Sequence, residues 1–169
     1  MRLTTRTNLA LRTLMFCAVN RDTLVRKHDA AQAVNASENH LAQVINKLAQ
    51  DGFIVTLRGR HGGFHLARDP GSISVGAVFR AFESGLPFIE CFSDNNTCPL
   101  KAHCAMRPHL ARAVEAFYSA LDELYLSELV ACNVGLKALL SIEGPRLPAT
   151  CRPQLFEEPV AGIAPEVVA

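Results

Sequence analysis

The chain has 169 residues, of which 49% are hydrophobic and 20% are charged, so it is long enough to fold around one hydrophobic core. Its net charge of +1 is unevenly distributed. Residues 1–70 contain ten Lys and Arg against five Asp and Glu, whereas residues 71–169 contain seven against eleven. A basic first half and an acidic second half predict a nucleic-acid-binding unit joined to a sensor or partner unit. The sequence has neither a membrane span nor a signal-peptide pattern, so we expect a cytoplasmic protein whose thiols stay reduced.

The first part of the chain has the apolar spacing of three helices, over residues 5–19, 30–35 and 38–52. Asp29 and Ser37 precede the second and third helices and are typical N-cap residues. Two short helices in tandem, the second with one polar face, predict a helix-turn-helix motif. The residues of this motif that we expect to contact DNA are Ser37, Asn39, His40, Gln43 and Lys47.

Residues 53–68 contain two short apolar runs around a glycine-containing turn, which predicts a β-hairpin. The hairpin is basic at its turn, where Arg58, Arg60 and His61 suit a phosphate backbone or a minor groove. A helix-turn-helix motif followed by a basic hairpin is a winged helix. We therefore expect residues 1–70 to form a winged helix-turn-helix DNA-binding domain.

The second half predicts further helices over residues 75–83, 109–125 and 127–140. Residues 71–141 are thus expected to hold a cysteine loop and dimerisation helices, and the proline-rich residues 142–169 a disordered tail. The fold class predicted for the whole chain is mainly α with a small β-hairpin. The long helix has a two-heptad apolar seam that suits dimerisation, formed by Leu110, Val114, Phe117, Leu121 and Leu124.

Three cysteines lie close together in a stretch that we call the cysteine segment (residues 91–104): Cys91, Cys98 and Cys104. Soft thiolate ligands favour zinc, copper(I) or an iron–sulfur cluster. His103 or His109 could complete a Cys3His zinc site. The chemistry of these residues therefore leaves both the iron–sulfur and the zinc interpretations open. The spacing indicates no Cys–His catalytic pair and the chain has no substrate domain, so an enzyme is not predicted.

Taken together, these motifs resemble a known family, the IscR/NsrR-type iron–sulfur winged-helix transcriptional regulators, over about residues 1–140. The stretch IECFSDNNTC is most similar to the nitric-oxide-sensitive repressors of the NsrR branch, and TNLALR also resembles the iron-responsive RirA branch. The resemblance is carried by residues 1–15, 36–48, 55–67, 74–83 and 117–130 and by the cysteine segment.

The resemblance implies a homodimer in which Cys91, Cys98 and Cys104 hold a [4Fe–4S] cluster, with a [2Fe–2S] cluster or zinc as alternatives. It implies that the cluster-bearing form represses transcription from a palindromic double-stranded DNA operator and that nitric oxide releases it. The alternative functions are a repressor of the same family that senses iron or iron–sulfur status, and a zinc-stabilised DNA-binding protein. In some NsrR proteins, an aspartate from the first helix of the partner subunit is the fourth ligand. This chain has Asn8 at that position, and Arg107 where IscR proteins have a histidine ligand.

Overall fold

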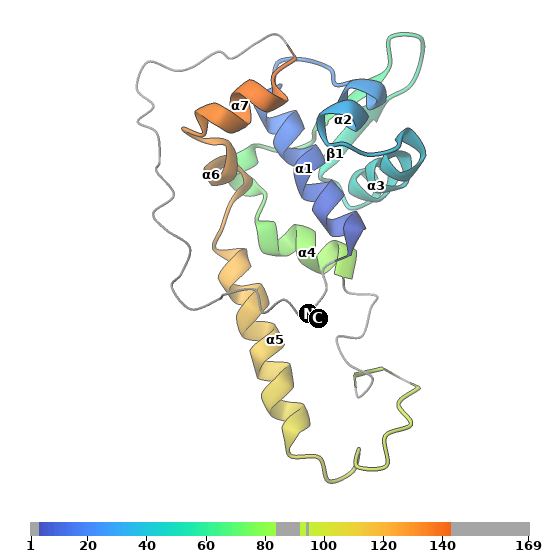
Figure 1. Ribbon diagram of the computed structural model, residues 1–169, viewed down its shortest axis with the longest axis vertical. Coiled ribbons are helices and arrows are strands. Elements are labelled where there is room, and N and C mark those ends of the chain that lie inside the picture. Colours follow the sequence, from blue (N-terminus) through green and yellow to red (C-terminus); the bar gives the residue numbers. More distant parts are fainter. Residues whose placement is uncertain (1–3, 84–91, 94, 143–169) are drawn as a thin grey trace, which may run out of the picture.

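The structure is a computed structural model, and it describes residues 4–83, 92–93 and 95–142. These residues form a mainly helical body with one antiparallel hairpin, and the long helix α5 extends away from that body (Figure 1). The predicted fold class is confirmed. None of the described helices is long and apolar enough to cross a membrane. In chain order, the elements are α1 (Thr5–Val19), α2 (Lys27–Ala33), α3 (Glu38–Gln50), β1 (Ile54–Leu57), β2 (Gly63–Leu66), the 3-10 turn η1 (Pro70–Ser72), α4 (Val75–Glu83), α5 (Met106–Asp122), α6 (Leu126–Val130) and α7 (Val134–Leu140).

Helix α1 is the central element of the body, because α2, α3, α4, α6 and α7 all pack against it. Leu14 of α1 is fully buried in one core with Leu41 of α3 and Leu126 of α6. The helix begins after Thr4, whose hydroxyl accepts a hydrogen bond from the backbone N–H of Thr7. One helix therefore connects the DNA-binding half of the chain to the half that contains the cysteines. The predicted domain boundary at residue 70 stays a prediction.

Helices α2 and α3 form the predicted helix-turn-helix. Helix α3 begins as predicted, since the Ser37 side chain accepts a hydrogen bond from the backbone N–H of His40 at 3.3 Å. Helix α2 begins earlier than predicted, at Lys27, with Arg26 as its N-cap residue. Asp29 lies inside its first turn, where a carboxylate is favoured by the helix dipole although it caps nothing.

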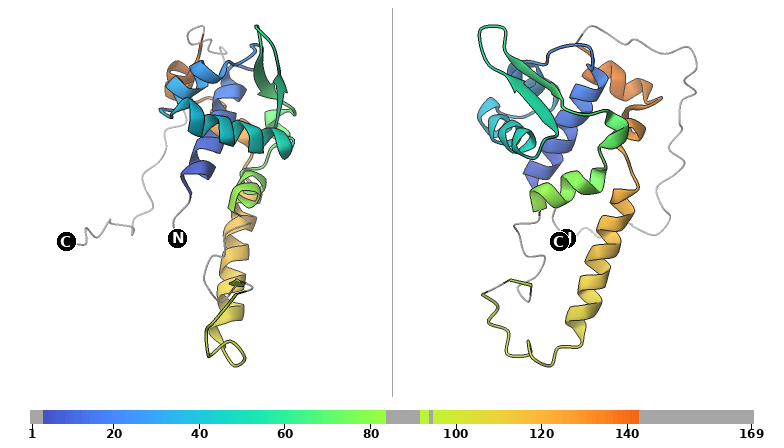
Figure 2. Two further views of the ribbon diagram at one scale, coloured as in Figure 1. Left: turned by 90° about the vertical axis from the view of Figure 1, so that its right-hand side faces the viewer. Right: turned by 180° about the vertical axis from the view of Figure 1, so that it is seen from behind.

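The hairpin lies beside this motif and completes the winged helix (Figure 2). Its register pairs Ile54 with Leu66 and Leu57 with Gly63. Gly63 must be small, because a Cβ there would overlap the backbone of Val25, which pairs with the next residue of the strand. Gly59 in the turn has a φ of 122°, a conformation that other residues rarely adopt. Gly59 therefore allows the hairpin turn, and Gly63 allows the hairpin to pack against the backbone of Val25.

The second half departs from prediction at two helix boundaries. Helix α5 begins at Met106, before Pro108, because the first turn of a helix has free N–H positions and tolerates proline. The single final helix predicted over 127–140 is two helices, α6 and α7. Cys132 breaks it with a φ of 48°, and Asn133 caps the second piece by accepting a hydrogen bond from the Leu136 N–H. The predicted disordered tail lies outside the described residues, apart from Ile142.

Candidate DNA-binding surface and candidate metal centre

The first part of the site is the polar face of α3. Asn39 and Gln43 are exposed on it and His40 is partly exposed, while the opposite face packs in the core. Ser37 is exposed at the N-terminal end of the helix. Its oxygen serves as the helix cap, which leaves its O–H free to donate. Side chains of these types can read base edges or hold a phosphate when the helix enters a major groove.

Lys47, also predicted to contact DNA, is held by an ion pair. Its Nζ lies 3.0 Å from Oδ1 of Asp51, one helical turn away in sequence. The second carboxylate oxygen of Asp51 is buried and has no hydrogen-bond partner among the described residues, so removing Lys47 would leave a partly buried carboxylate unpaired. Binding a phosphate would require Lys47 to leave this pair. Its contribution to DNA affinity should therefore be smaller than that of an unpaired lysine.

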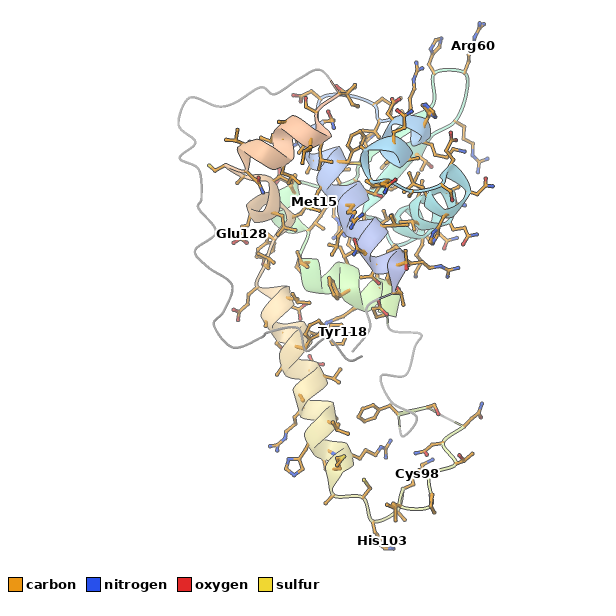
Figure 3. The ribbon with its side chains drawn as sticks, in the orientation of Figure 1. Met15, Arg60, Cys98, His103, Tyr118 and Glu128 are labelled. Carbon is orange, nitrogen blue, oxygen red and sulfur yellow. The ribbon has the colours of Figure 1, made fainter. Side chains whose placement is uncertain are left out.

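The basic end of the hairpin forms the second part of the site. Arg58, Arg60 and His61 are all exposed. Figure 3 shows Arg60 at the tip of the hairpin, pointing away from the body. None of the three takes part in an ion pair with another described residue. Their charges are therefore free to meet the phosphate backbone.

A further residue of the surface, Arg6, was not predicted from the sequence. Its Nη2 donates a hydrogen bond to Oε1 of Gln43 at 3.1 Å, which joins α1 to α3. A guanidinium group can only donate, so the carboxamide oxygen of Gln43 faces Arg6 and its NH2 group points away. Arg6 thus restricts how Gln43 presents itself to a base. No local sequence pattern indicates this pair, because its members are separated by 37 positions.

The one acidic residue in the first turn of α3 is neutralised by helix α2. Glu38 lies 3.0 Å from both Nδ1 of His28 and Nζ of Lys27. Hydrogen bonds from His28 and then from Lys27 hold the pKa of the Glu38 carboxyl below its usual value. The carboxylate would otherwise repel phosphates at the N-terminal end of α3, which is the recognition helix of the predicted helix-turn-helix motif. Lys27 and His28 of α2 reduce this repulsion.

Asn8 lies on the exposed side of α1, next to the start of α3. No described residue makes a hydrogen bond to its side chain. It lines a cavity of about 360 Å³ together with Arg12, Ser37 and His40. Arg12 also donates a hydrogen bond to the carbonyl oxygen of Val34, in the turn of the helix-turn-helix, at 3.3 Å. The predicted cluster-ligand position therefore shares a cavity with two predicted DNA contacts.

The candidate metal centre is described only in part. Cys98 and Cys104 are free thiols of intermediate exposure, and Cys91 lies outside the described residues. The carboxamide oxygen of Asn96 accepts a hydrogen bond from the backbone N–H of Cys98 at 2.8 Å, which orders the chain before this thiol. Figure 3 shows Cys98 and His103 beyond the N-terminal end of α5, at the far end of the molecule from Arg60. Within the described ranges, no three Cys, His, Asp or Glu side chains gather at a metal-sized site.

The chemistry of the cysteine segment nevertheless fits a thiolate-bound cluster. Residues 95–114 contain lysine and arginine but no aspartate or glutamate. Lys101 lies in the segment, which also contains Asp94, and Arg107 follows it. Positive charge near the site offsets the negative charge of a thiolate-bound cluster. Cys17 is the opposite case, because burial in the core raises the pKa of its thiol to about 12. The donor set of the cysteine segment therefore suits an iron–sulfur cluster, while Cys17 is a packing residue.

Helix α5 joins the cysteine segment to the body through α4. The Arg80 guanidinium lies 2.8 Å from both Oε1 of Glu115 and Oδ2 of Asp122, and it stacks over the Tyr118 ring. These contacts cover only the C-terminal part of α5. No residue of α5 is buried, although its predicted seam is apolar (Figure 1). An apolar seam left partly exposed over two heptads suits the pairing with another helix that the sequence predicts.

Comparison with known proteins identifies the family. Residues 3–132 match the Rrf2 family, described as iron-dependent transcriptional regulators. The chain is 39% identical over 142 residues to the transcriptional regulator NsrR of Geobacillus kaustophilus, which covers 83% of this chain and 97% of the relative.

A second curated relative and a solved structure show the same likeness. The chain is 40% identical over 137 residues to the transcriptional repressor NsrR of Streptomyces coelicolor, which covers 80% of this chain and 92% of the relative. The solved structure of T. potens IscR has the same fold, with a TM-score of 0.60 and 23% identity over 77% of this chain and 86% of that one. These relatives are regulators of transcription and not enzymes. With a family match over residues 3–132 and relatives of this similarity, the chain belongs to the Rrf2 family of transcriptional regulators.

Proposed function

We propose that this protein is a homodimeric DNA-binding repressor that senses nitric oxide through a [4Fe–4S] cluster held by Cys91, Cys98 and Cys104. The observation that carries the proposal is the cysteine segment itself, in which Cys98 and Cys104 are free, partly exposed thiols close in sequence to Lys101. When bound, the cluster supplies iron that reacts with nitric oxide. The likeness to regulators named NsrR supports this choice of signal over iron.

The DNA-binding part of the proposal depends on two copies of α3. In a dimer formed along α5, each subunit presents the polar face of α3 to a major groove and its hairpin to the flanking backbone. Ser37, Asn39, His40 and Gln43 are then the candidate base and phosphate contacts from the helix, and Lys47 contributes only if it leaves Asp51. A two-fold symmetric protein requires a palindromic operator, which agrees with the expectation from the sequence.

The fourth ligand is proposed to come from the partner subunit at the position of Asn8. Within one subunit, the first turn of α1 and the cysteine segment lie apart in every view (Figures 1 and 2). Asn8 is exposed, and no described residue makes a hydrogen bond to its side chain. A neutral carboxamide oxygen is a weaker iron ligand than a carboxylate, so this side of the cluster would be open to a small diatomic molecule.

Anaerobic purification tests the cofactor. The protein should contain iron and acid-labile sulfide, and it should bind a duplex selected in vitro from a random library. Adding nitric oxide should release that duplex. Replacing Cys91, Cys98 or Cys104 with alanine should abolish iron and sulfide, whereas Cys17→Ala should retain both because its thiol is buried.

The outcomes separate the alternatives. A colourless protein with bound zinc would replace the sensor with a structural zinc site. A cluster-bearing protein that responds to iron depletion and not to nitric oxide would identify an iron-responsive repressor. Full iron occupancy in Cys98→Ala would rule out the proposed ligand set.

A further inference from the structure

Helix α4 ends at a carboxylate that contacts α1. Glu83 Oε1 accepts a hydrogen bond from the backbone N–H of Thr4 and another from the Thr4 hydroxyl, both at 2.9 Å. It also accepts one from the Thr7 hydroxyl. Thr7 is fully buried. We call this set of hydrogen bonds the Glu83 clasp.

The clasp supplies α1 with a charge that its own sequence lacks. The first turn of α1 contains no acidic residue, although the N-terminal end of a helix favours a negative charge. Burial raises the pKa of the Glu83 carboxyl, but hydrogen bonds from Thr7 and Thr4 outweigh that effect and hold the pKa below its usual value. Glu83 is therefore ionised at neutral pH. The clasp is a charged tertiary cap on α1.

The position of the clasp relates it to the cysteines. Glu83 is the last residue of α4, and the chain continues from it through residues 84–90 to Cys91. The other end of the cysteine segment leads into α5, which Arg80 of α4 binds through Glu115. Both ends of the cysteine segment are thus connected to α4. A change in that segment can move Glu83 directly through the chain.

The helix that the clasp holds, α1, also contacts the recognition helix α3. The clasp holds the first turn of α1, from which Arg6 donates to Gln43 of α3. One turn beyond Asn8, Arg12 donates to the carbonyl oxygen of Val34, in the turn before α3. The described contacts therefore run without a gap from the end of α4, through α1, to the residues that face DNA.

We propose that Glu83 couples the cysteine segment to the recognition helix of the same subunit by holding the N-terminal end of α1. This inference rests on the proposed sensing function. It adds a connection between the cysteine segment and α3 within one subunit, beside the connection through the ligand proposed from the partner subunit. Glu83 is a positioning residue here, because its hydrogen bonds within the described residues go to Thr4 and Thr7 and not to Cys98 or Cys104. Coupling of this kind requires an element whose position both sites influence, and the first turn of α1 is that element.

The test compares variants that break the clasp with variants that keep it. Glu83→Gln removes the charge at nearly constant shape, and Thr7→Val removes a hydroxyl at constant shape. Thr7→Ser retains the hydroxyl and should restore the behaviour of the original protein. Glu128→Gln is the matched control, because the Glu128 carboxylate accepts a hydrogen bond from the Tyr125 N–H and takes part in neither the clasp nor the α4–α5 contact.

Two measurements are made on each full-length variant. The first is amide hydrogen exchange of the cluster-free protein, where Glu83→Gln and Thr7→Val should increase exchange in residues 4–12 and 37–43, and Glu128→Gln should not. The second is the ratio of affinities of the cluster-bearing and cluster-free forms for the selected duplex. This ratio should fall by about 2- to 30-fold in the clasp variants and stay constant in Thr7→Ser and Glu128→Gln.

Each contrary result has a distinct meaning. A normal ratio in Glu83→Gln and Thr7→Val would overturn the coupling, even if both variants were less stable. Unchanged exchange in residues 4–12 would overturn the clasp itself. If the original protein bound the duplex equally well with and without its cluster, the proposed sensing function would fail, and the coupling with it.

Discussion

The guanidinium of Arg6 and the carboxamide of Gln43 form a hydrogen bond of 3.1 Å between α1 and α3. This bond fixes the side-chain amide of an exposed residue on the recognition helix. Because Arg6 holds the carboxamide oxygen on its own side, Gln43 turns its N–H donors toward a base, although the oxygen keeps a second lone pair. Donors match acceptors such as guanine N7 and O6 or thymine O4, whereas an unrestrained glutamine pairs with adenine through both groups.

Arg6→Ala should therefore change the base preference at the position that Gln43 contacts. Freed from Arg6, Gln43 should shift toward adenine, with a change in discrimination of about 1–3 kcal/mol. Titration against duplexes carrying each base pair at that position measures the shift. Arg58→Ala removes an equal charge from the hairpin and should leave the preference unaltered. The same preference in Arg6→Ala and in the original protein would refute the restraint.

Arg60→Ala tests the role of the hairpin. Arg60 points away from the body and lacks an ion-pair partner among the described residues, so its loss should weaken binding to all duplexes alike. The slope of log affinity against log salt should decrease by about one. Arg21→Ala is the control, because Arg21 is already paired with Asp69 at 2.6 Å. A sequence-dependent loss in Arg60→Ala would mean that the hairpin reads bases.

Asn8→Asp tests the fourth ligand. A carboxylate binds iron more strongly than a carboxamide, so the cluster of Asn8→Asp should survive longer in air. Asn8→Ala should change the lifetime little if water or a small molecule already occupies the position. Visible absorption followed over time compares the three proteins. Identical lifetimes in all three would place the ligand elsewhere, and His103 and His109 would be substituted next.

Gly76→Ala should weaken the contact between α4 and α5. A Cβ at Gly76 would lie 2.7 Å from the backbone nitrogen of Asp122 and would overlap its carboxylate. The free energy of unfolding should fall by about 1–3 kcal/mol, measured by urea denaturation. In Gly135→Ala, the new Cβ meets only Oδ1 of Asn133 at 4.0 Å, so the helix-favouring alanine should be neutral or stabilising. An equal decrease in the free energy of unfolding in the two variants would show that the close packing of Gly76 against Asp122 does not contribute to stability.

Val114→Glu should convert the dimer to a monomer. Val114 is a partly exposed residue of the α5 seam, and in the proposed dimer a carboxylate there would be desolvated between two helices. Ser119→Glu adds the same charge to an exposed position of α5 outside the seam. Sedimentation velocity at micromolar concentration distinguishes the two species. A dimeric Val114→Glu protein would place the interface on another surface.

Local signals in the sequence were sufficient for most of the fold. The Ser37 cap, the apolar spacing of residues 5–19 and Gly59 in the hairpin turn act within short stretches of chain. The three cysteines and the polar residues of α3 could also be found this way, because ligand types and exposed faces are properties of a short stretch. The break at Cys132 was missed, because the apolar spacing of residues 127–140 does not indicate its left-handed φ of 48°.

Tertiary structure alone decided how these parts are connected. The pair Arg6–Gln43 joins residues 37 positions apart, and Thr7–Glu83 joins residues 76 positions apart. Neither contact can be predicted from a periodic or local pattern in the sequence. Both exist because α1 is buried between α3 and α4, which brings its first turn to the two helices at once. Where a helix forms depends largely on residues that are close together in the sequence. Which side chains of different helices meet depends on how the whole chain buries its apolar surface.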